Sequence, residues 1–199
     1  MNQELLCVDT IMAYNDLLGV ETLHPLASVI DLSKARPVGQ VCQVFGFYVI
    51  YLRDGEHGGC MELLYGRRRC DCRRGTVVCV PPGQVVSLGS GDGDCRPAGW
   101  ALCFEPELIR DTPLGRHIRD YSYFSFAANG ALRLSEQERK TVMDSLSKIN
   151  HELTQGIDRL SRRLIATNIE LLLDYCQRFY ERQLVSRPTA RRDSLKRLE

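Results

Sequence analysis

The sequence predicts a mainly β chain of the α+β class, with a strand-rich half first and a helical half after it. Short segments rich in β-branched and aromatic residues follow one another from about residue 26 to Phe104, separated by Gly, Pro and Asp turns. Such regular strand spacing is typical of an antiparallel barrel or sandwich. After Phe104 the apolar residues recur at helical spacing. We therefore expect an N-terminal helix (1–20), a barrel (21–105), a helical segment (106–185) and a linker (186–199).

The composition is that of an ordinary folded chain: 199 residues, 44% hydrophobic and 26% charged, with a formal net charge of +1. A net charge so close to zero gives the whole chain no strong electrostatic attraction to nucleic acids or acidic membranes. The first residues lack the pattern of a secretory signal, and no apolar run approaches the ~20 residues of a membrane span. The nine cysteines are therefore expected to be reduced thiols. We expect a cytoplasmic protein with no membrane partner.

Local signals place the helices. At the N-terminus, Gly19 is positioned to end a helix whose apolar face is formed by Ile11, Tyr14, Leu17 and Leu18. Thr112 and Pro113 can cap and open a short helix, and Ser135 with Glu138 forms a capping-box pattern. The helix that follows this box has one apolar stripe, made of Val142, Leu146, Ile149 and Leu153.

The last helix is expected over about 157–184, and the tail is expected to break at Pro188 and to lead to a further domain. This helix has two apolar stripes, and something must cover the second one, either another helix of this chain or a second copy. One stripe is a heptad-like seam, and it is our candidate dimer interface: Ile165, Ile169, Leu172, Cys176 and Phe179. The other, offset stripe contains Leu160, Leu164, Leu171 and Tyr175.

The segment "GTVVCVPPGQVV" raises the question of a metal site. The spacing of Gly75, Pro81 and Gly83 resembles the second half-motif of the cupin barrel, in which a histidine ligand lies three residues beyond the last glycine. Val86 occupies that position here, and the asparagine position four residues later is Ser90. The side chain of Val86 supplies no ligand atom, so this half-motif predicts the barrel without its metal.

The first cupin half-motif, an H-x-H pair with a glutamate, has no match in the chain. Starting it at Gly46 would place Leu52 and Asp54 in the histidine positions. The four histidines, at 24, 57, 117 and 151, fall in segments that are not expected to converge. No nucleophile elbow, P-loop or dinucleotide-binding motif is present either. We expect no enzyme activity and no cofactor.

Two other segments could carry chemistry, and each has a simpler structural interpretation. Cys70 and Cys72 could share a zinc ion with Cys60 or Cys79, although zinc knuckles usually use C-x2-C spacing. The run 67–74 contains five arginines and could bind anions, but a solvated edge strand protected by charge is the favoured explanation.

Aromatic residues of the strands suggest where a small molecule could bind. Phe45, Phe47, Val49 and Tyr51 alternate with Gly46, Tyr48 and Ile50, so each set would share one face of a single strand. Small-molecule pockets are mostly apolar with a few polar tips, which Tyr and Trp supply. The candidate effector-binding residues are Tyr48, Tyr51, Tyr65 and Trp100.

The order of these parts resembles the N-terminal regulatory half of AraC-family transcriptional regulators. The resemblance is carried by "YNDLLGVETLHPLASVIDLS", "RRGTVVCVPPGQVV", "GWALCFEPELIRDTPLGRHIRDYSYFSF" and "LRLSEQERKTVMDSL", and it covers most of the chain from residue 14 to about 185. The run from "GWALCF" to "LRLSEQE" looks particularly like the AraC-type proteins common in Bacteroidetes.

This resemblance implies a cupin-like, double-stranded β-helix barrel that binds a small effector without a metal, followed by helices that form a homodimer. DNA binding would belong to a C-terminal domain with two helix-turn-helix motifs, which this chain lacks. The alternatives are a small cupin isomerase or oxygenase with non-standard metal ligands, and a stand-alone ligand-binding barrel with a disordered tail.

Overall fold

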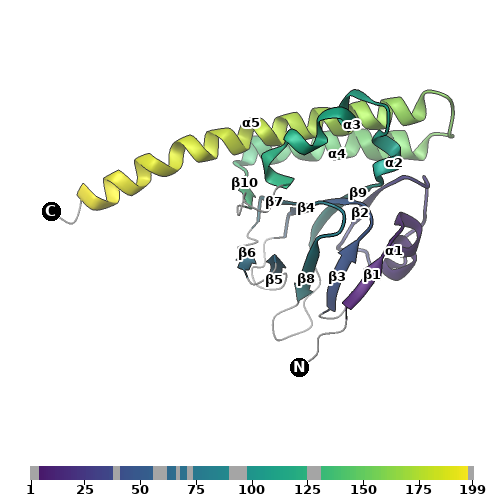
Figure 1. The fold of residues 1–199 in the computed structure, drawn as a ribbon, viewed down its shortest axis with the longest axis horizontal. Helices are drawn as coiled ribbons and strands as arrows, with labels where there is room; N and C mark the ends of the chain where they lie inside the picture. The colour runs from purple at the N-terminus through teal and green to yellow at the C-terminus, as the bar shows by residue number, and fades with distance from the viewer. Residues whose placement is uncertain are drawn as a thin grey trace.

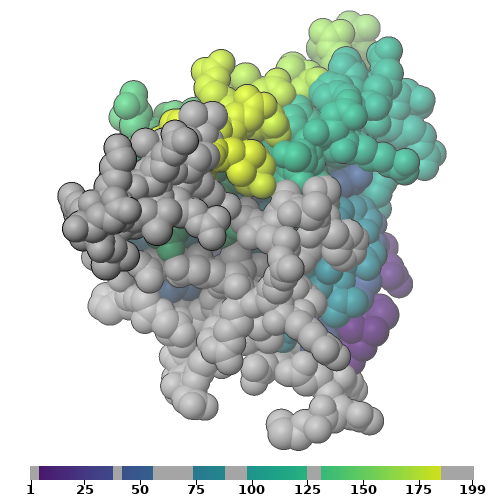
Figure 2. Space-filling model, turned by 60° about the vertical axis from the view of Figure 1, so that its left-hand side comes forward, coloured from purple at the N-terminus to yellow at the C-terminus, as the bar shows by residue number. Residues whose placement is uncertain are grey.

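Two β-sheets and a layer of helices make up the structure. The computed structural model describes residues 5–37, 41–55, 62–65, 68–70, 74–89, 98–124 and 131–196, with side chains for all except 41, 62–65, 68–70, 88–89 and 185–196. Figure 1 shows the helices stacked on one sheet, with the second sheet below it. From another direction, Figure 2 shows the same order, with helical residues in green and yellow above the blue strand residues and the purple N-terminal segment.

Each sheet contains five strands, and every described strand pair is antiparallel except β1 with β3. Sheet A consists, in spatial order, of β1 (Leu5–Val8), β3 (Val41–Phe45), β8 (Val85–Gly89), β5 (Glu62–Tyr65) and β6 (Arg68–Cys70). Sheet B consists of β10 (Leu132–Arg133), β7 (Thr76–Val80), β4 (Tyr48–Arg53), β9 (Gly99–Phe104) and β2 (Ala27–Asp31).

The predicted α+β class is confirmed, with one correction to its balance. Helix is the larger share of the described residues, because α4 (Glu136–Thr154) and α5 (Ser161–Lys196) alone contain 19 and 36 residues. A second correction concerns closure. Among the described strands, none pairs across from sheet A to sheet B, so the expected barrel is a pair of facing sheets.

The chain passes from sheet A to sheet B at Gly46, inside a segment that the sequence predicts as one continuous strand. A Cβ atom at Gly46 would lie 2.5 Å from the backbone oxygen of Asp9, and the Gly46 amide donates a hydrogen bond to the Val8 carbonyl at 2.9 Å. Only a residue without a side chain fits this close approach. The predicted single strand is therefore β3 and β4, one in each sheet.

The N-terminal helix forms as predicted, as α1 (Ile11–Leu18), which packs between the sheets. The side chain of Thr10 caps its first turn, and Gly19 ends it in the left-handed conformation with φ of 67°. Leu17 was expected on the apolar face but is 37% exposed, since neighbouring helical residues lie about 100° apart. The face that is buried consists of Ile11, Tyr14 and Leu18.

Short helical turns connect sheet B to the long helices. Thr112 caps the second of them by accepting a hydrogen bond from the Gly115 amide, as predicted. Arg162 of α5 fixes the end of the first by donating hydrogen bonds to three backbone carbonyls, those of Glu107, Leu108 and Arg110. The turns are α2 (Pro106–Ile109), α3 (Pro113–His117), η1 (Ile118–Asp120) and η2 (Ser122–Phe124).

The capping box at the start of α4 is present: Ser135 accepts from the Glu138 amide, and the Glu138 carboxylate accepts from the Ser135 amide. The predicted apolar stripe of α4 is also confirmed, since its four residues are at most 3% exposed: Val142, Leu146, Ile149 and Leu153. Both signals lie within the helix itself, and α4 forms where they predict because the capping box and the apolar stripe indicate the same helix.

The last helix is longer than predicted. α5 runs from Ser161 to Lys196 and continues through Pro188, so the expected break at this proline is wrong. Proline removes one amide donor and disturbs a helix, but it does not always end one. Figure 1 shows α5 crossing the whole helical layer and continuing beyond the sheets at its C-terminal end. None of the described helices is long and apolar enough to cross a membrane.

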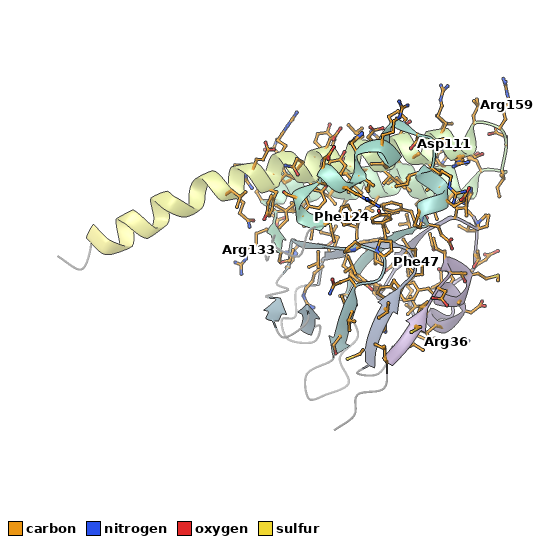
Figure 3. All side chains as sticks on the ribbon, in the orientation of Figure 1. Arg36, Phe47, Asp111, Phe124, Arg133 and Arg159 are labelled. Carbon is orange, nitrogen blue, oxygen red and sulfur yellow. The ribbon has the colours of Figure 1, made fainter. Side chains whose placement is uncertain are left out.

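Two apolar clusters hold these layers together. The helix-facing core lies between sheet B and the helices, and the inter-sheet core lies between sheets A and B together with α1. In Figure 3, Phe47 lies in the inter-sheet core and Phe124 lies in the helix-facing core. Successive residues of β4 alternate between the two cores, because successive strand side chains point to opposite faces.

Candidate functional site

The candidate site is the inter-sheet core, and β3 and β8 form one of its walls. The two glycines of the half-motif both have left-handed backbone: Gly75, just before β7, and Gly83, in the turn between β7 and β8, have φ values of 74° and 77°. The Gly83 amide donates to the Phe45 carbonyl at 2.8 Å, which fixes this turn against the end of β3. Val86 follows and is fully buried in the inter-sheet core.

The strand beside Val86 carries two more inward-facing residues. Gln43 pairs with Val86 across the β3–β8 ladder, so the two side chains share a face. Phe45 lies two residues further along the same face, and both Gln43 and Phe45 are 0% exposed. An apolar side chain at Val86 and a phenyl ring at Phe45 supply no metal ligand. The residues present at this wall therefore do not fit a metal ion.

The first half-motif was placed incorrectly by starting it at Gly46. Leu52 lies in the helix-facing core, and Asp54 forms an ion pair with Arg139 of α4, with 2.8 Å between the nearest oxygen and nitrogen. Both residues therefore face the helices. Because a shift of one residue along a strand moves a side chain to the opposite face, the inward-facing residues of β4 are Val49, Tyr51 and Arg53.

The four candidate effector-binding residues do not form one group. Tyr51 is buried in the inter-sheet core, whereas Tyr48 and Trp100 pack against the helix-facing core on the other side of sheet B. The Tyr48 ring stacks on Phe104 with 4.9 Å between ring centroids. Tyr65 lies across from Val86 in the β5–β8 ladder, but its side chain is outside the described residues. Of the three placed side chains, only Tyr51 can face a molecule between the sheets.

Gln43 is the polar residue that the sequence analysis missed. Its side chain is 0% exposed, and neither amide atom has a hydrogen-bond partner among the described residues. A buried amide in a native structure normally has a partner, and an exception needs an explanation. Its strand parity could have revealed it, because Gln43 is two residues from the buried Phe45 in a run otherwise made of Val, Cys and Phe.

The hydroxyls of Tyr14 and Tyr51 form a buried pair opposite this wall. They lie 3.0 Å apart and join α1 to β4. Burial raises the pKa of both hydroxyls well above the ordinary tyrosine range, so both stay neutral at physiological pH. The Tyr14 ring also packs edge-on against Phe45, with 5.3 Å between centroids. The aromatic end of the interior is therefore uncharged.

Polar groups increase towards the other end of the interior. Arg53 and Thr76 face each other across the β4–β7 ladder and are 6% and 1% exposed. Arg53 brings a positive charge to this end, next to the Asp54 ion pair that faces outwards. The interior thus changes from aromatic near α1, through the Gln43 amide, to polar beside Arg53. Such a mixture of apolar walls and few polar groups is typical of a small-molecule site.

A family model supports this view of the chain. The model for the AraC-like ligand binding domain matches residues 47–173, which begin just before β4 and end in α5. The chain belongs to this family. It is therefore a regulatory ligand-binding domain of AraC type with a cupin-like α+β fold. No curated protein matches the chain. The more specific resemblance to Bacteroidetes proteins stays a prediction.

In this AraC-type domain, three buried thiols and His24 occupy positions in the folded core and at a turn, where they play a structural part. Cys79, Cys103 and Cys176 are buried, and burial raises the pKa of each thiol, to about 12 for Cys176. Such thiols stay protonated and unreactive at neutral pH. His24 accepts a hydrogen bond from the Leu26 amide, and burial lowers its pKa. Within the described part of the chain, no three His, Cys, Asp or Glu residues gather as a metal site would require.

Several of the sequence hypotheses fall wholly or partly on residues that the structure does not describe. Cys60, Cys72, His57 and Ser90 lie outside the described residues, as does most of the loop after Gly89. Part of the arginine-rich run is placed: β6 (Arg68–Cys70) is the outermost strand of sheet A among those described. An edge strand is what the simpler interpretation of that run predicts.

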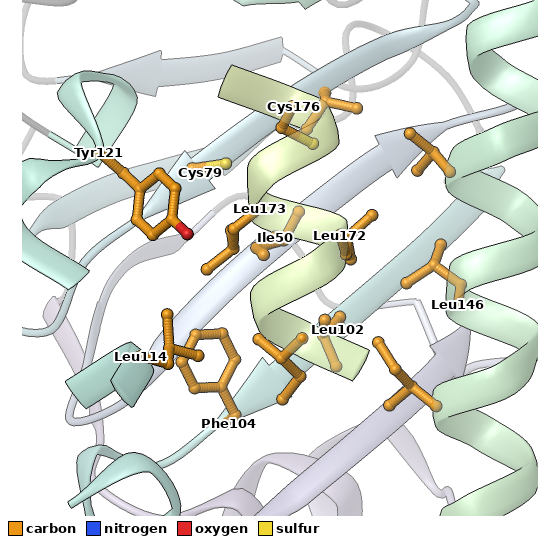
Figure 4. Packing of buried hydrophobic residues seen from close by; sticks show 14 of the residues in the cluster. Ile50, Cys79, Leu102, Phe104, Leu114, Tyr121, Leu146, Leu172, Leu173 and Cys176 are labelled. Carbon is orange, nitrogen blue, oxygen red and sulfur yellow. The ribbon is translucent and has the colours of Figure 1, made fainter. Parts of the chain in front are cut away.

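The heptad-like seam of α5 is buried inside a single chain. Its five residues, the candidate dimer interface, are at most 8% exposed and belong to the helix-facing core: Ile165, Ile169, Leu172, Cys176 and Phe179. Figure 4 shows α5 in front of sheet B, with Leu172, Leu173 and Cys176 of the helix near Ile50, Leu102 and Phe104 of the sheet. A helix with two apolar stripes can bury either of them against its own chain, and α5 buries the seam. A partner of α5 would therefore contact the other stripe.

Proposed function

We propose that this chain is the effector-sensing and dimerisation domain of an AraC-type transcription regulator. The family match over residues 47–173 carries the proposal, because it spans both the sheets and the helices. A small effector binds between the sheets without a metal, and the protein acts in the cytoplasm, where thiols such as Cys103 stay reduced. A helix-turn-helix domain of the full-length protein reads the DNA, because this domain offers no such motif in its described part.

The second stripe of α5 supports a homodimer. Leu164 and Leu171 of α5 are 40% and 42% exposed, and Leu160, in the turn just before the helix, is 40% exposed. Tyr175 continues the same face and is half-buried at its edge. We call these four residues the exposed stripe. Apolar side chains that recur along one helix face in water favour burial against a partner. The predicted dimer interface therefore moves from the buried seam to the exposed stripe.

An ion pair offers a route from the effector site to the dimer helices. Arg139 donates hydrogen bonds to both carboxylate oxygens of Asp54, at 2.8 and 3.1 Å, and Asp54 follows the inward-facing Arg53. Arg139 lies in the first turn of α4, and α4 packs against α5. A ligand that displaces Arg53 would thus act on α4 directly. Differential binding of the ligand to two such arrangements is what regulation requires.

A fusion experiment tests the proposal. The chain would be joined to a DNA-binding domain that binds its operator only as a dimer, and repression of a reporter gene would be measured in cells. We expect repression with the unchanged chain and a loss of repression with Leu164→Glu, which places a charge in the exposed stripe. Leu184→Glu is the matched control, because Leu184 is a leucine of the same helix that is 44% exposed but lies off the stripe.

Two results would contradict the proposal. Repression that survives both Leu164→Glu and Leu171→Glu would show that the exposed stripe does not hold a dimer together. Elemental analysis that finds stoichiometric iron, manganese, nickel or zinc in the purified chain would favour the alternative, a small cupin enzyme with unusual ligands.

A further inference from the structure

The buried side chain of Gln43 destabilises the domain when no ligand is bound. A primary amide offers two donors and an acceptor with two lone pairs, and both Gln43 heavy atoms are buried without a hydrogen-bond partner in the described ranges. Leaving buried polar atoms unsatisfied destabilises a folded protein, whereas an apolar residue of similar shape at the same place does not. Stability alone therefore favours a methionine or leucine at this position.

The described neighbours of Gln43 along its strand and in its two ladders are apolar and uncharged. Leu6 and Val86 lie on either side of it in the β1–β3 and β3–β8 ladders, and Phe45 is its neighbour along β3. Counted from Gly46, Gln43 is the second inward residue on the β3 side and Tyr51 is the third on the β4 side, on sheets that face one another. The Tyr51 hydroxyl already has Tyr14 as its partner. Facing sheets lie about 10 Å apart, so a group bound between them can reach the amide.

We propose that Gln43 is a specificity-determining residue of the effector site, and that it binds an uncharged ligand with an adjacent hydrogen-bond donor and acceptor. This inference rests on the proposed sensor function. A carboxamide or lactam edge matches the Gln43 amide best, because donor meets acceptor at both positions. A vicinal diol can supply the same pair of groups. A carboxylate offers only acceptors and would carry its charge into an apolar region, which costs free energy.

The unliganded chain provides the first test. Gln43→Met keeps the length of the side chain and removes both amide atoms. We expect its Tm to rise by about 2–8 °C, as follows from removal of unsatisfied polar atoms in a chain of this size. Gln183→Met is the matched control and should lower the Tm, because the Gln183 amide accepts a hydrogen bond from the Arg133 amide at 2.8 Å and donates one to the Ala131 carbonyl at 3.4 Å. A lower Tm for Gln43→Met would overturn the proposal, since it would show that buried water already satisfies the amide.

Matched ligands provide the second test. Benzamide and benzoate, and nicotinamide and nicotinate, differ only in the amide and carboxylate, and xylose serves as a diol probe. We expect the neutral probes to raise the Tm of the unchanged chain more than the carboxylates, and Gln43→Met to lose this response. Equal responses from both proteins, or no response to any neutral probe, would overturn the assignment. The dimerisation on which the proposed regulator function depends is judged separately, by the reporter fusion, so the two can fail independently.

Discussion

At the scale of single residues, the hydroxyls of Tyr14 and Tyr51 stabilise one another inside the inter-sheet core. Tyr14 is 2% exposed and Tyr51 4% exposed, so neither hydroxyl has ready access to water. Their mutual hydrogen bond, at 3.0 Å, joins the helix that closes one end of the interior to the central strand of sheet B. The effect of each hydroxyl therefore depends on the presence of the other.

Tyr51→Phe should lower the free energy of unfolding by about 1–3 kcal/mol, because it leaves the Tyr14 hydroxyl buried without its partner. Tyr14→Phe should cost a similar amount. The double substitution should cost clearly less than the sum of the two, since no unpaired hydroxyl then remains. Urea unfolding of the four proteins measures this coupling. Strict additivity would show that water or another group already serves both hydroxyls.

The sequence predicts which aromatic residues lie in strands, but it does not predict which face of the sheet each of them occupies. Tyr48, Tyr51 and Trp100 are all aromatic strand residues, yet only Tyr51 lies in the inter-sheet core. Their placement depends on the sheet switch at Gly46 and on strand register, both of which are set by tertiary contacts. The strand parity of Gln43 with Phe45 indicates an inward-facing residue, but the lack of a hydrogen-bond partner for its amide among the described residues depends on tertiary contacts that the sequence does not show.

At the scale of elements, Asp158 secures the start of α5. Its carboxylate accepts hydrogen bonds from the amides of Leu160 and Ser161, each at 2.8 Å. The hydrogen bond from the Leu160 amide is the main cause that lowers the Asp158 pKa, followed by the bond from the Ser161 hydroxyl. The folded chain thus favours the ionised carboxylate, which also suits the positive end of the helix dipole.

Stability at acidic pH tests this cap. Because the folded pKa is lowered, the contribution of Asp158 is present above the ordinary value of 3.8 and is lost as the pH falls through the lowered pKa. Asp158→Asn should reduce the Tm at neutral pH and should weaken the further loss of Tm on acidification. Thermal unfolding measured from neutral pH to about pH 2 shows both effects. An unchanged acid profile in the variant would contradict this role.

The helices show how far local signals predict an element. The capping box at Ser135 and the stripe that includes Leu146 predicted α4, because caps and periodicity are encoded within the element itself. The end of α5 was not predicted, since Pro188 gives the same signal in a helix that ends and in one that continues. The choice between the two stripes of α5 was also not predictable, because each stripe is apolar and only the packed helices and sheet select one.

At the scale of the whole molecule, one side of α5 packs in the core of its own chain, and the opposite side is the one we propose for assembly. Leu172 is 0% exposed in the helix-facing core, whereas its neighbour Leu171 is 42% exposed. The fold of one chain therefore uses one side of the helix and leaves the other exposed, and in the proposed dimer this exposed side meets the partner. An effector between the sheets can influence that partner only through sheet B and the helices stacked on it.

Adjacent leucines of α5 separate these two roles in one experiment. Leu172→Glu would bury an unpaired carboxylate against sheet B and should destabilise the chain by about 3–5 kcal/mol, enough to abolish the fold of a marginally stable domain. Leu171→Glu should change the stability of the isolated chain by only about 0.5 kcal/mol, because the new charge faces water, yet it should weaken self-association. Urea unfolding at low protein concentration measures the first quantity, and sedimentation over a concentration series measures the second. If Leu171→Glu unfolds the chain, the exposed stripe is part of the core. If it stays folded and associates as strongly as the unchanged chain, the dimer uses another surface.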